Sequence, residues 1–387
     1  MKKKEKIIIR FLLISAIGLW SILAWTFYED VLRYGPGSMK DFVRVPGENS
    51  TQTNLSASPI SNSPDSYNQA NLEPVSSPTE QPAYCGGPAR MTLLAIGSDT
   101  RAQTYLYGLA DVIRYIRIDF VTPKISVLEF PRDLWVEIPG IEDHYGITHG
   151  KLNQSYFYGN PGMGYYTGAN EGPGLLIKTL GLNFGANPDH YAAVNMQTFV
   201  RMVDTIGGID INLPFSVDAR KPDQTVRKDL YFAPGYHHLN GEQTLMLGRI
   251  REYSVFARAD QQNRILCALK NEVLSPAILP KVPELIDHFI NAVQTDLSIE
   301  DVTQLACLTA FIKPENIIFT TFPRELLTEA RTYDIGVKKD VYIFKADFQT
   351  LRQYVRSFDN GTWPVTTPNT TTFETPRPRG EGTFSCP

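Results

Sequence analysis

Apolar residues in the middle of the chain follow two spacings, a period of two that is typical of strands and a period near 3.6 that is typical of helices. Strands are predicted over Met91–Ile96, Val112–Phe120, Lys124–Phe130, His190–Asn195, Ile209–Leu213, Ile317–Phe322 and Val341–Lys345. Helices are predicted over Pro173–Leu180, Met196–Ile206, Gly241–Leu247, Arg258–Leu274, Glu300–Ile312 and Phe348–Phe358. Because strands and helices alternate, the pattern predicts a layered α/β domain with a central sheet.

Two of these strands are separated by a short turn. Thr122-Pro123 lies between Val112–Phe120 and Lys124–Phe130, and along the first strand Ile116 and Ile118 occupy the more apolar face. The spacing and the turn predict an antiparallel pair. Farther on, Tyr156, Tyr158, Tyr165 and Tyr166 stand among glycines, which predicts a mobile aromatic loop on the surface or along a glycan or lipid path.

The N-terminus carries a long uncharged apolar run. Phe11–Phe27 has no charged residue, and residues 7–27 together make 21 residues, or about 30 Å of helix, which matches a bilayer core. Four lysines precede the run and Glu29 and Asp30 follow it, which places the N-terminus in the cytoplasm and the rest outside. A cleaved signal peptide is the alternative, but no small-x-small site follows the run. We expect one transmembrane anchor in the cell membrane and an extracytoplasmic domain.

Composition separates the folded part from its tethers. Residues 46–82 and 362–387 are rich in Ser, Thr and Pro and lack apolar periodicity, so both are expected to be disordered. The expected organisation is residues 1–30 as stub and anchor, 31–87 as linker, 88–360 as the domain and 361–387 as the tail. The net charge of −4 argues against a nucleic-acid partner, which would call for a basic excess.

The four cysteines lie beyond the apolar run and form no C-x-x-C motif. An oxidising compartment permits disulfides between them. Cys267 and Cys307 lie in two predicted helices and are expected to pair, and Cys85 and Cys386 flank the domain and are expected to pair. Four free thiols are the alternative.

Charged residues gather where predicted strands end, which is where ligand crevices form in α/β sheets. These residues are Asp99 and Arg101 after the first strand, Asp111 before the second, Arg132 after the third, and Arg249, Arg251, Arg258 and Arg264 within Gly248–Arg264. Asp99 and Asp111 suit Mg²⁺, which takes one or two carboxylates plus phosphate oxygens. Arginine forks match phosphate geometry. Together they indicate a diphosphate ligand.

Five segments in order resemble the motifs of the LytR-CpsA-Psr family of cell-envelope proteins. They are GSDTR from Gly97, VLEFPRDLWVEIPG from Val127, KLNQSYFYG from Lys151, NMQTFVRMVDTIGGIDINLP from Asn195 and YFAPGYHHLNGEQTLMLGRIR from Tyr231. The resemblance implies a three-layer α/β/α domain with a mixed sheet and a hydrophobic groove for a lipid tail. It also implies transfer of a glycopolymer from a polyprenyl diphosphate carrier to a hydroxyl of peptidoglycan or another wall acceptor.

The resemblance assigns roles residue by residue. It implies that Asp99 and Asp111 hold Mg²⁺, and that Asp99, Arg101 and Arg132 are catalytic. It implies that the diphosphate meets a set of arginines, which are Arg101, Arg132, Arg251 and Arg258, with Arg249 in the same run. The general base is not assigned, and Asp99 is one candidate.

Two positions depart from the family pattern. Leu109 and Gln261 stand where the family has arginines. A second hypothesis therefore stays open, in which the domain binds a lipid diphosphate as a scaffold or regulator of envelope assembly with little turnover. A third is a polyprenyl pyrophosphatase that uses water as the acceptor.

Overall fold

The computed structural model describes residues 82–100, 104–220, 227–250, 255–273, 281, 284–285, 292–365 and 384–386. The predicted anchor and most of the predicted linker lie outside these ranges. Arg101 and Arg251 lie outside them too. None of the helices inside the ranges combines the length and the hydropathy that a membrane crossing requires.

Seven strands in the described ranges form a central mixed sheet, in the order β11-β6-β1-β2-β3-β12-β15. Their bounds are β1 Arg90–Ser98, β2 Ala110–Asp119, β3 Lys124–Glu129, β6 His190–Asn195, β11 Gln294–Thr295, β12 Ile317–Thr321 and β15 Phe384–Ser385. The β1, β2 and β3 strands form an antiparallel meander, which confirms the predicted pair. The β6 strand adds parallel to β1, and β12 adds parallel to β3. The carboxyl ends of β1, β3, β6 and β12 therefore share one edge of the sheet.

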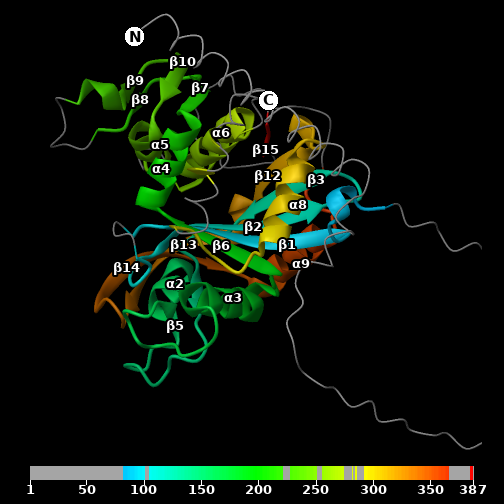
Figure 1. Cartoon of the computed structure of the whole chain (residues 1–387). Coiled ribbons are helices and arrows are strands. Elements are labelled where there is room, and N and C mark those ends of the chain that lie inside the picture. The colour runs from blue at the N-terminus through cyan, green and yellow to red at the C-terminus, as the bar shows by residue number, and fades with distance from the viewer. Residues whose placement is uncertain are drawn as a thin grey trace, which may run out of the picture. The chain divides into compact units, whose positions relative to one another are not determined.

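Helices cover both faces of this sheet (Figure 1). The helices of the described ranges are α2 Leu152–Gly159, α3 Glu171–Phe184, α4 Met196–Ile206, α5 Gly241–Gly248, α6 Val255–Val273, α8 Ile299–Thr309 and α9 Phe348–Asp359. Along β2, the buried Ile113 and Tyr115 point into the core shared with α2, α3 and α9. Ile118, from the alternate set, points into the core shared with α6 and α8. The period of two thus explains why both faces are apolar.

Smaller elements surround the sheet. Two-stranded ribbons are β4 Trp135–Glu137 with β5 His149–Lys151, β7 Ile209–Leu213 with β10 Gly235–Leu239, β8 Val217–Asp218 with β9 Tyr231–Phe232, and β13 Leu327–Asp334 with β14 Lys339–Ala346. Short 3-10 turns are η3 Tyr84–Gly86, η4 Lys228–Leu230, η6 Pro314–Asn316 and η7 Arg324–Leu326. The β7–β10 ribbon packs with α4, α5 and α6 around a second core.

Most predicted elements are confirmed within a few residues, and three differences have clear causes. Helix α3 runs through Gly181 to Phe184, because Gly185 takes the left-handed conformation that ends it. The predicted aromatic loop is wrong for Tyr156 and Tyr158, which are buried in α2 with exposures of 0% and 3%. Strand β13 was not predicted, because its polar residues hide the alternation.

The domain also extends beyond the predicted limits of residues 88–360. Residues 82–87 include η3, whose Tyr84 amide donates to the carbonyl of Phe120. At the other end, β15 pairs with β12, so this part of the predicted tail belongs to the sheet.

All four cysteines form disulfides, but not in the expected pairs. Cys85 bonds to Cys307 and Cys267 bonds to Cys386, so the expected pairs Cys267–Cys307 and Cys85–Cys386 are wrong. The η3 turn packs against α8, and Cys267 and Cys386 share the core beneath α6. Each end of the domain is therefore fastened to a different helix on one face of the sheet.

We expect loss of the Cys267–Cys386 bond, in a Cys267→Ala and Cys386→Ala double variant, to lower the free energy of unfolding by about 2–5 kcal/mol. The reason is that the bond holds residues 119 positions apart in the unfolded chain. Denaturant unfolding measures the change. Peptide mapping without reduction should find Cys85 joined to Cys307, and a peptide joining Cys267 to Cys307 would contradict this pairing.

Candidate functional site

The turn between β1 and β2 holds the first predicted carboxylate. The Asp99 amide donates to the carbonyl of Leu109 at 3.0 Å, and the Leu109 amide donates to Oδ1 of Asp99 at 2.7 Å. Gly108 precedes Leu109 at φ +140, and a Cβ there would overlap the Thr100 hydroxyl. Asp99 therefore closes this loop, and Oδ2 is its atom without a hydrogen bond in the described part of the chain.

A β-bulge positions the second carboxylate. Gly97 pairs with Val112 and Ser98 pairs with Ala110, so Asp111 is the extra residue of β2 at this point. Bulges occur next to active sites because they redirect a side chain while the flanking pairs stay in register. Here the bulge lies beside the carboxyl end of β1, next to the loop that Asp99 closes.

Arg132, just after β3, joins two carboxylates. Its Nη1 donates to Oδ1 of Asp111, and its Nε donates to Oδ2 of Asp133 at 3.3 Å. Asp133 is 6% exposed and also accepts a 2.7 Å hydrogen bond from Lys151 Nζ. We call Asp111, Arg132, Asp133 and Lys151 the site network. It ties β2, the segment after β3 and the start of α2 to one point.

The charges of the site network balance formally, with two carboxylates against two cations. Burial lowers the pKa of Arg132, but Asp111 and Asp133 outweigh burial and raise it, so the guanidinium stays charged. A diphosphate at this point must compete with Asp111 for Arg132 or bring its own cation. The network alone therefore does not supply the full positive charge that such a ligand needs.

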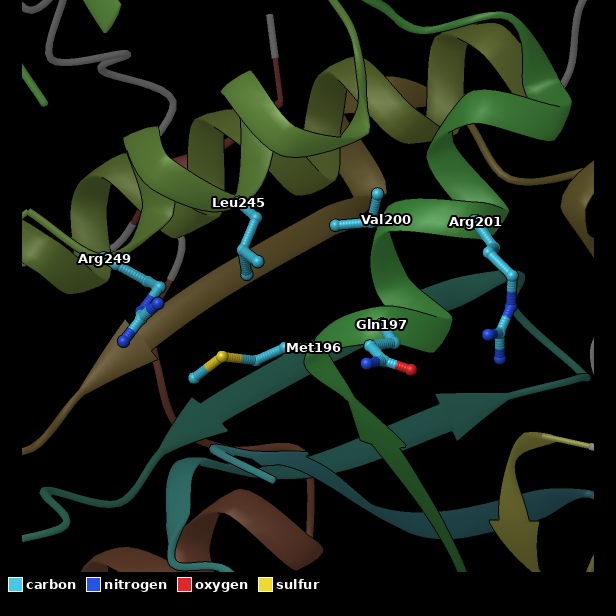
Figure 2. Close-up of a pocket in the computed structure, with 6 residues that line it drawn as sticks. All are labelled: Met196, Gln197, Val200, Arg201, Leu245 and Arg249. Atoms are coloured by element: carbon cyan, nitrogen blue, oxygen red, sulfur yellow. The ribbon is translucent and has the colours of Figure 1, made fainter. Parts of the chain in front are cut away.

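An open cavity of about 430 Å³ lies nearby between α4 and α5 (Figure 2). Its lining is Met196, Gln197, Val200, Arg201, Leu245 and Arg249. Arg201 and Arg249 stand at opposite ends of the labelled group, with Met196 between them. Met196 directly follows Asn195, which pairs with Ser98 of β1. The α4 wall of the cavity therefore begins at the same edge of the sheet as Asp99.

The face of β2 and β3 that packs against α6 carries a buried polar network that the sequence did not reveal. Arg114, 2% exposed, donates to Glu129 at 3.1 Å and to Asn263 of α6 at 2.7 Å. Burial raises the pKa of Glu129, and the neighbouring Arg114 and Arg258 lower it in part. Arg114 lies directly across from Glu129 in the β2–β3 register. The sequence did offer one signal for this network, which is a pair of opposite charges at facing positions of the predicted antiparallel strands.

The structure thus brings some predicted site residues together and not others. Asp111 and Arg132 touch, and Asp99 lies in the neighbouring turn. Arg249 lines the cavity, and Arg258 is buried at 7% exposure near Glu129. Gln261 is 8% exposed, and its Nε2 has no hydrogen-bond partner in the described ranges.

A metal at this site would have few protein ligands. No cluster of three or more His, Cys, Asp or Glu side chains in the described ranges could hold a metal ion. Asp99 and Asp111 offer two carboxylates, of which Asp111 is already paired with Arg132. Mg²⁺ commonly takes one or two carboxylates and completes its octahedron with water and phosphate oxygens. The residues therefore fit a Mg²⁺ that arrives with a diphosphate.

We expect Asp260 to make stability fall as the pH rises. Burial, and to a smaller degree Glu129, raise the pKa of Asp260 to about 7, although Arg264 lowers it. The folded state keeps a proton that the unfolded chain loses near about pH 4, so the stabilisation present below that pH is lost as the pH rises through about 7. Asp260→Asn should reduce this slope and raise the free energy of unfolding near pH 8 by about 1–4 kcal/mol.

Denaturant unfolding between about pH 5 and pH 8 measures this slope. Asp340→Asn, at an exposed carboxylate, is the matched control and should keep the parent slope. An Asp260→Asn variant with the slope of the parent protein would show that Asp260 titrates normally.

Three comparisons place the chain among known proteins. It is 25% identical over 273 residues to regulatory protein MsrR of Staphylococcus aureus, covering 70% of this chain and 74% of MsrR. It is 30% identical over 236 residues to the polyisoprenyl-teichoic acid–peptidoglycan teichoic acid transferase TagU of Oceanobacillus iheyensis, covering 59% and 65%. The crystal structure of Bacillus subtilis TagV has the same fold, with a TM-score of 0.53 and 22% identity over 70% of this chain and 97% of that one.

A sequence profile of one family matches residues 50–354, which is more than half of the chain and contains every residue of the site network. The resemblance carried by the five sequence motifs is thereby confirmed, and the chain belongs to the LytR_cpsA_psr family.

Proposed function

We propose that this protein is a phosphotransferase that moves a glycopolymer from a polyprenyl diphosphate carrier to a hydroxyl of peptidoglycan or a related wall acceptor. Family membership and the names of TagU and TagV support a transferase of this class. The observation that carries the proposal is the meeting of Asp111 and Arg132 at the sheet edge from which α4, one wall of the cavity with Arg249, begins.

The chemistry follows from the charges at this edge. The acceptor oxygen forms a bond to the sugar-linked phosphorus, the bridging phosphorus–oxygen bond breaks, and polyprenyl phosphate leaves with the electron pair. The hydroxyl proton passes to solvent or to Asp99. Arg132, Arg249 and Arg258 stabilise the charge that develops on the phosphates, and Arg101 and Arg251, which the family resemblance assigns to the diphosphate, are proposed to join them.

Mg²⁺ is part of the proposal. Held by Asp99 and Asp111, it would neutralise charge on the leaving phosphate. Asp111 would then serve both Mg²⁺ and Arg132, so binding of the diphosphate must rearrange the ion pair between Asp111 and Arg132. Because Asp111 and the phosphate compete for Arg132, the guanidinium can exchange the carboxylate for the phosphate and keeps an anionic partner throughout.

We further propose that the domain works on the outer face of the cell membrane behind an N-terminal anchor. The uncharged run Phe11–Phe27 and the lysines before it support this topology. The two disulfides add independent support, since structural disulfides persist in oxidising compartments outside the cytoplasm. An anchored domain stays beside a substrate whose lipid tail remains in the bilayer.

A scaffold that binds lipid diphosphate is the second candidate function. It is favoured by Leu109 and Gln261, which replace two guanidinium groups of the family pattern. Gln261 is buried with an unpaired Nε2 in the described ranges, so it offers one neutral donor where an arginine would offer several charged ones. Hydrogen bonds to charged groups contribute about 1.5–3 kcal/mol, and neutral ones contribute less.

We expect Arg132→Ala to lower kcat for glycopolymer transfer by about 10²–10³-fold, because it removes a charge-stabilising group and leaves Asp111 and Asp133 without their shared cation. Arg356→Ala, at an exposed arginine of α9, is the matched control and should transfer at the parent rate. The measurement is transfer of labelled glycan from its polyprenyl diphosphate carrier to peptidoglycan in membranes. Parent activity in Arg132→Ala would contradict the proposed role.

Product analysis of the same assay separates the candidate functions. A transferase should give labelled peptidoglycan plus polyprenyl phosphate, and Asp111→Asn or chelation of Mg²⁺ should reduce both products together. A pyrophosphatase would release free glycan phosphate without labelling the wall. Tight retention of the carrier with no product, with or without Mg²⁺, would favour the scaffold.

A further inference from the structure

One tyrosine side chain joins the segment that carries Asp99 to a distant part of the sheet. We call residues 99, 100 and 104–109, between β1 and β2, the Asp99 turn. The hydroxyl of Tyr105 in this turn accepts a 3.2 Å hydrogen bond from the amide of Asn195. The same oxygen lies 2.6 Å from the carbonyl oxygen of Ala292 and 2.9 Å from that of Ala193. Since a hydroxyl has one proton and two lone pairs, it donates to one of these carbonyls at a time.

The contact returns the Asp99 turn to the strand pair at which it begins. Ser98, the last residue of β1, pairs with Asn195 of β6, and Asp99 follows Ser98 directly. Tyr105 then reaches the amide of the same Asn195. The Asp99 turn is therefore fixed to a single residue of β6 both at its start and at Tyr105.

Asn195 also begins α4, so the contact reaches one wall of the cavity. Its side-chain oxygen accepts the amide of Thr198 and thereby caps the helix. The Thr198 hydroxyl, which is fully buried, donates to the Ala292 carbonyl at 3.3 Å and accepts a hydrogen bond from Arg201 Nη2 at 3.2 Å. Arg201 lines the cavity (Figure 2). The hydroxyl of Tyr105 and the guanidinium of Arg201 are thus joined through one carbonyl and one threonine hydroxyl.

The Asp99 turn is anchored on its other side to residues that follow α2. The amide of Gly162 donates to the carbonyl of Leu106 at 3.0 Å, and Asn160 Nδ2 donates to the carbonyl of Gly108 at 3.3 Å. In the part of the chain that the structure describes, Tyr105 makes the side-chain hydrogen bonds from this turn to β6. Loss of its hydroxyl would leave the turn hydrogen-bonded on the α2 side only.

The hydroxyl is suited to set a position rather than to hold the fold. Burial raises the pKa of Tyr105, so the hydroxyl keeps the proton that it donates. One neutral hydrogen bond is a small part of the stability of a domain. It is enough to change the position of a loop, and a displacement of about 1 Å in an active site can cost about 10²-fold in rate. Because Oδ1 of Asp99 accepts the amide of Leu109, a shift of the turn also moves Oδ2 of Asp99.

We propose that Tyr105 is a positioning residue, which fixes the Asp99 turn against the end of β6 and the first turn of α4. Oδ2 of Asp99 then keeps a constant place relative to α4, as a Mg²⁺ bound with its diphosphate requires. The inference rests on the proposed function, in which Asp99 is a ligand of that ion. Tyr105 acts through this carboxylate and not by contact with the substrate.

The first experiment needs no turnover. Amide hydrogen exchange of the full chain in detergent micelles, read by mass spectrometry, follows the peptides that contain Asp99, Leu109 and Asn195. Tyr105→Phe keeps the ring and removes the hydroxyl, so we expect exchange in these peptides to be about fivefold faster. Tyr107→Phe, at a 54% exposed residue of the same turn, is the matched control and should exchange like the parent. Both variants should keep the parent unfolding midpoint, and equal exchange in the two would overturn the inference.

The second experiment asks whether the fixed turn serves the site. In the transfer assay, Tyr105→Phe should raise the Mg²⁺ concentration for half-maximal rate by about fivefold, and excess Mg²⁺ should restore most of the rate. Tyr107→Phe should keep the parent requirement. A purely structural role would lower the amount of active protein and leave that concentration unchanged. Faster exchange with an unchanged Mg²⁺ requirement would therefore contradict the positioning role.

These outcomes are distinct from a failure of the proposed function. If the parent chain transfers no glycan, the proposed function fails, whereas the exchange experiment still shows whether Tyr105 fixes the Asp99 turn. The Mg²⁺ requirement is then measured without turnover, as the concentration at which Mg²⁺ with inorganic diphosphate half-protects the same peptides from exchange. The same shift of about fivefold is expected for Tyr105→Phe in that measurement.

Discussion

The ion pairs of Arg132 are the interaction on which the rest of the site depends. One guanidinium joins Asp111, which a bulge places at the end of β2, to Asp133, which follows β3. Through Asp133 the same charge reaches Lys151 at the start of α2. Removing one partner of a buried charge pair leaves the other uncompensated, which is far more costly than the net value of the pair. The network therefore holds these three segments together at one edge of the sheet.

The sheet carries a second polar cluster around Arg114 and Glu129, on the face that packs against α6. Both residues are almost fully buried, and α6 supplies Asn263 to complete the hydrogen bonds of Arg114. Apolar side chains could fill this space with less desolvation cost. This buried network therefore costs stability, and α6 adds the buried Arg258 close to Glu129.

The two disulfides stabilise the domain at its margins. They fasten η3 to α8 and the C-terminal β15 to α6, on one face of the sheet. The other face, with α2, α3 and α9, has no cysteine in the described ranges and is held by apolar packing and by the contact of Asp334 with Gln154. Disulfides therefore crosslink the face of α6 and α8, whereas noncovalent contacts hold the face of α2, α3 and α9 in the part of the chain that the structure describes.

The secondary structure could be predicted from the sequence because helices and strands repeat with fixed geometry. Strands β6 and β7 and helix α4 have the predicted bounds, since side chains alternate every two residues in a strand and recur every 3.6 in a helix. The charged residues at predicted strand ends, together with the family resemblance, singled out Asp99, Asp111 and Arg132. The sequence could not show that Arg132 forms an ion pair with Asp111, 21 positions away, or that Asp111 occupies a bulge. It also could not show which cysteines pair. Those facts depend on distances between elements far apart in the chain, and only packing of the whole sheet against its helices sets such distances.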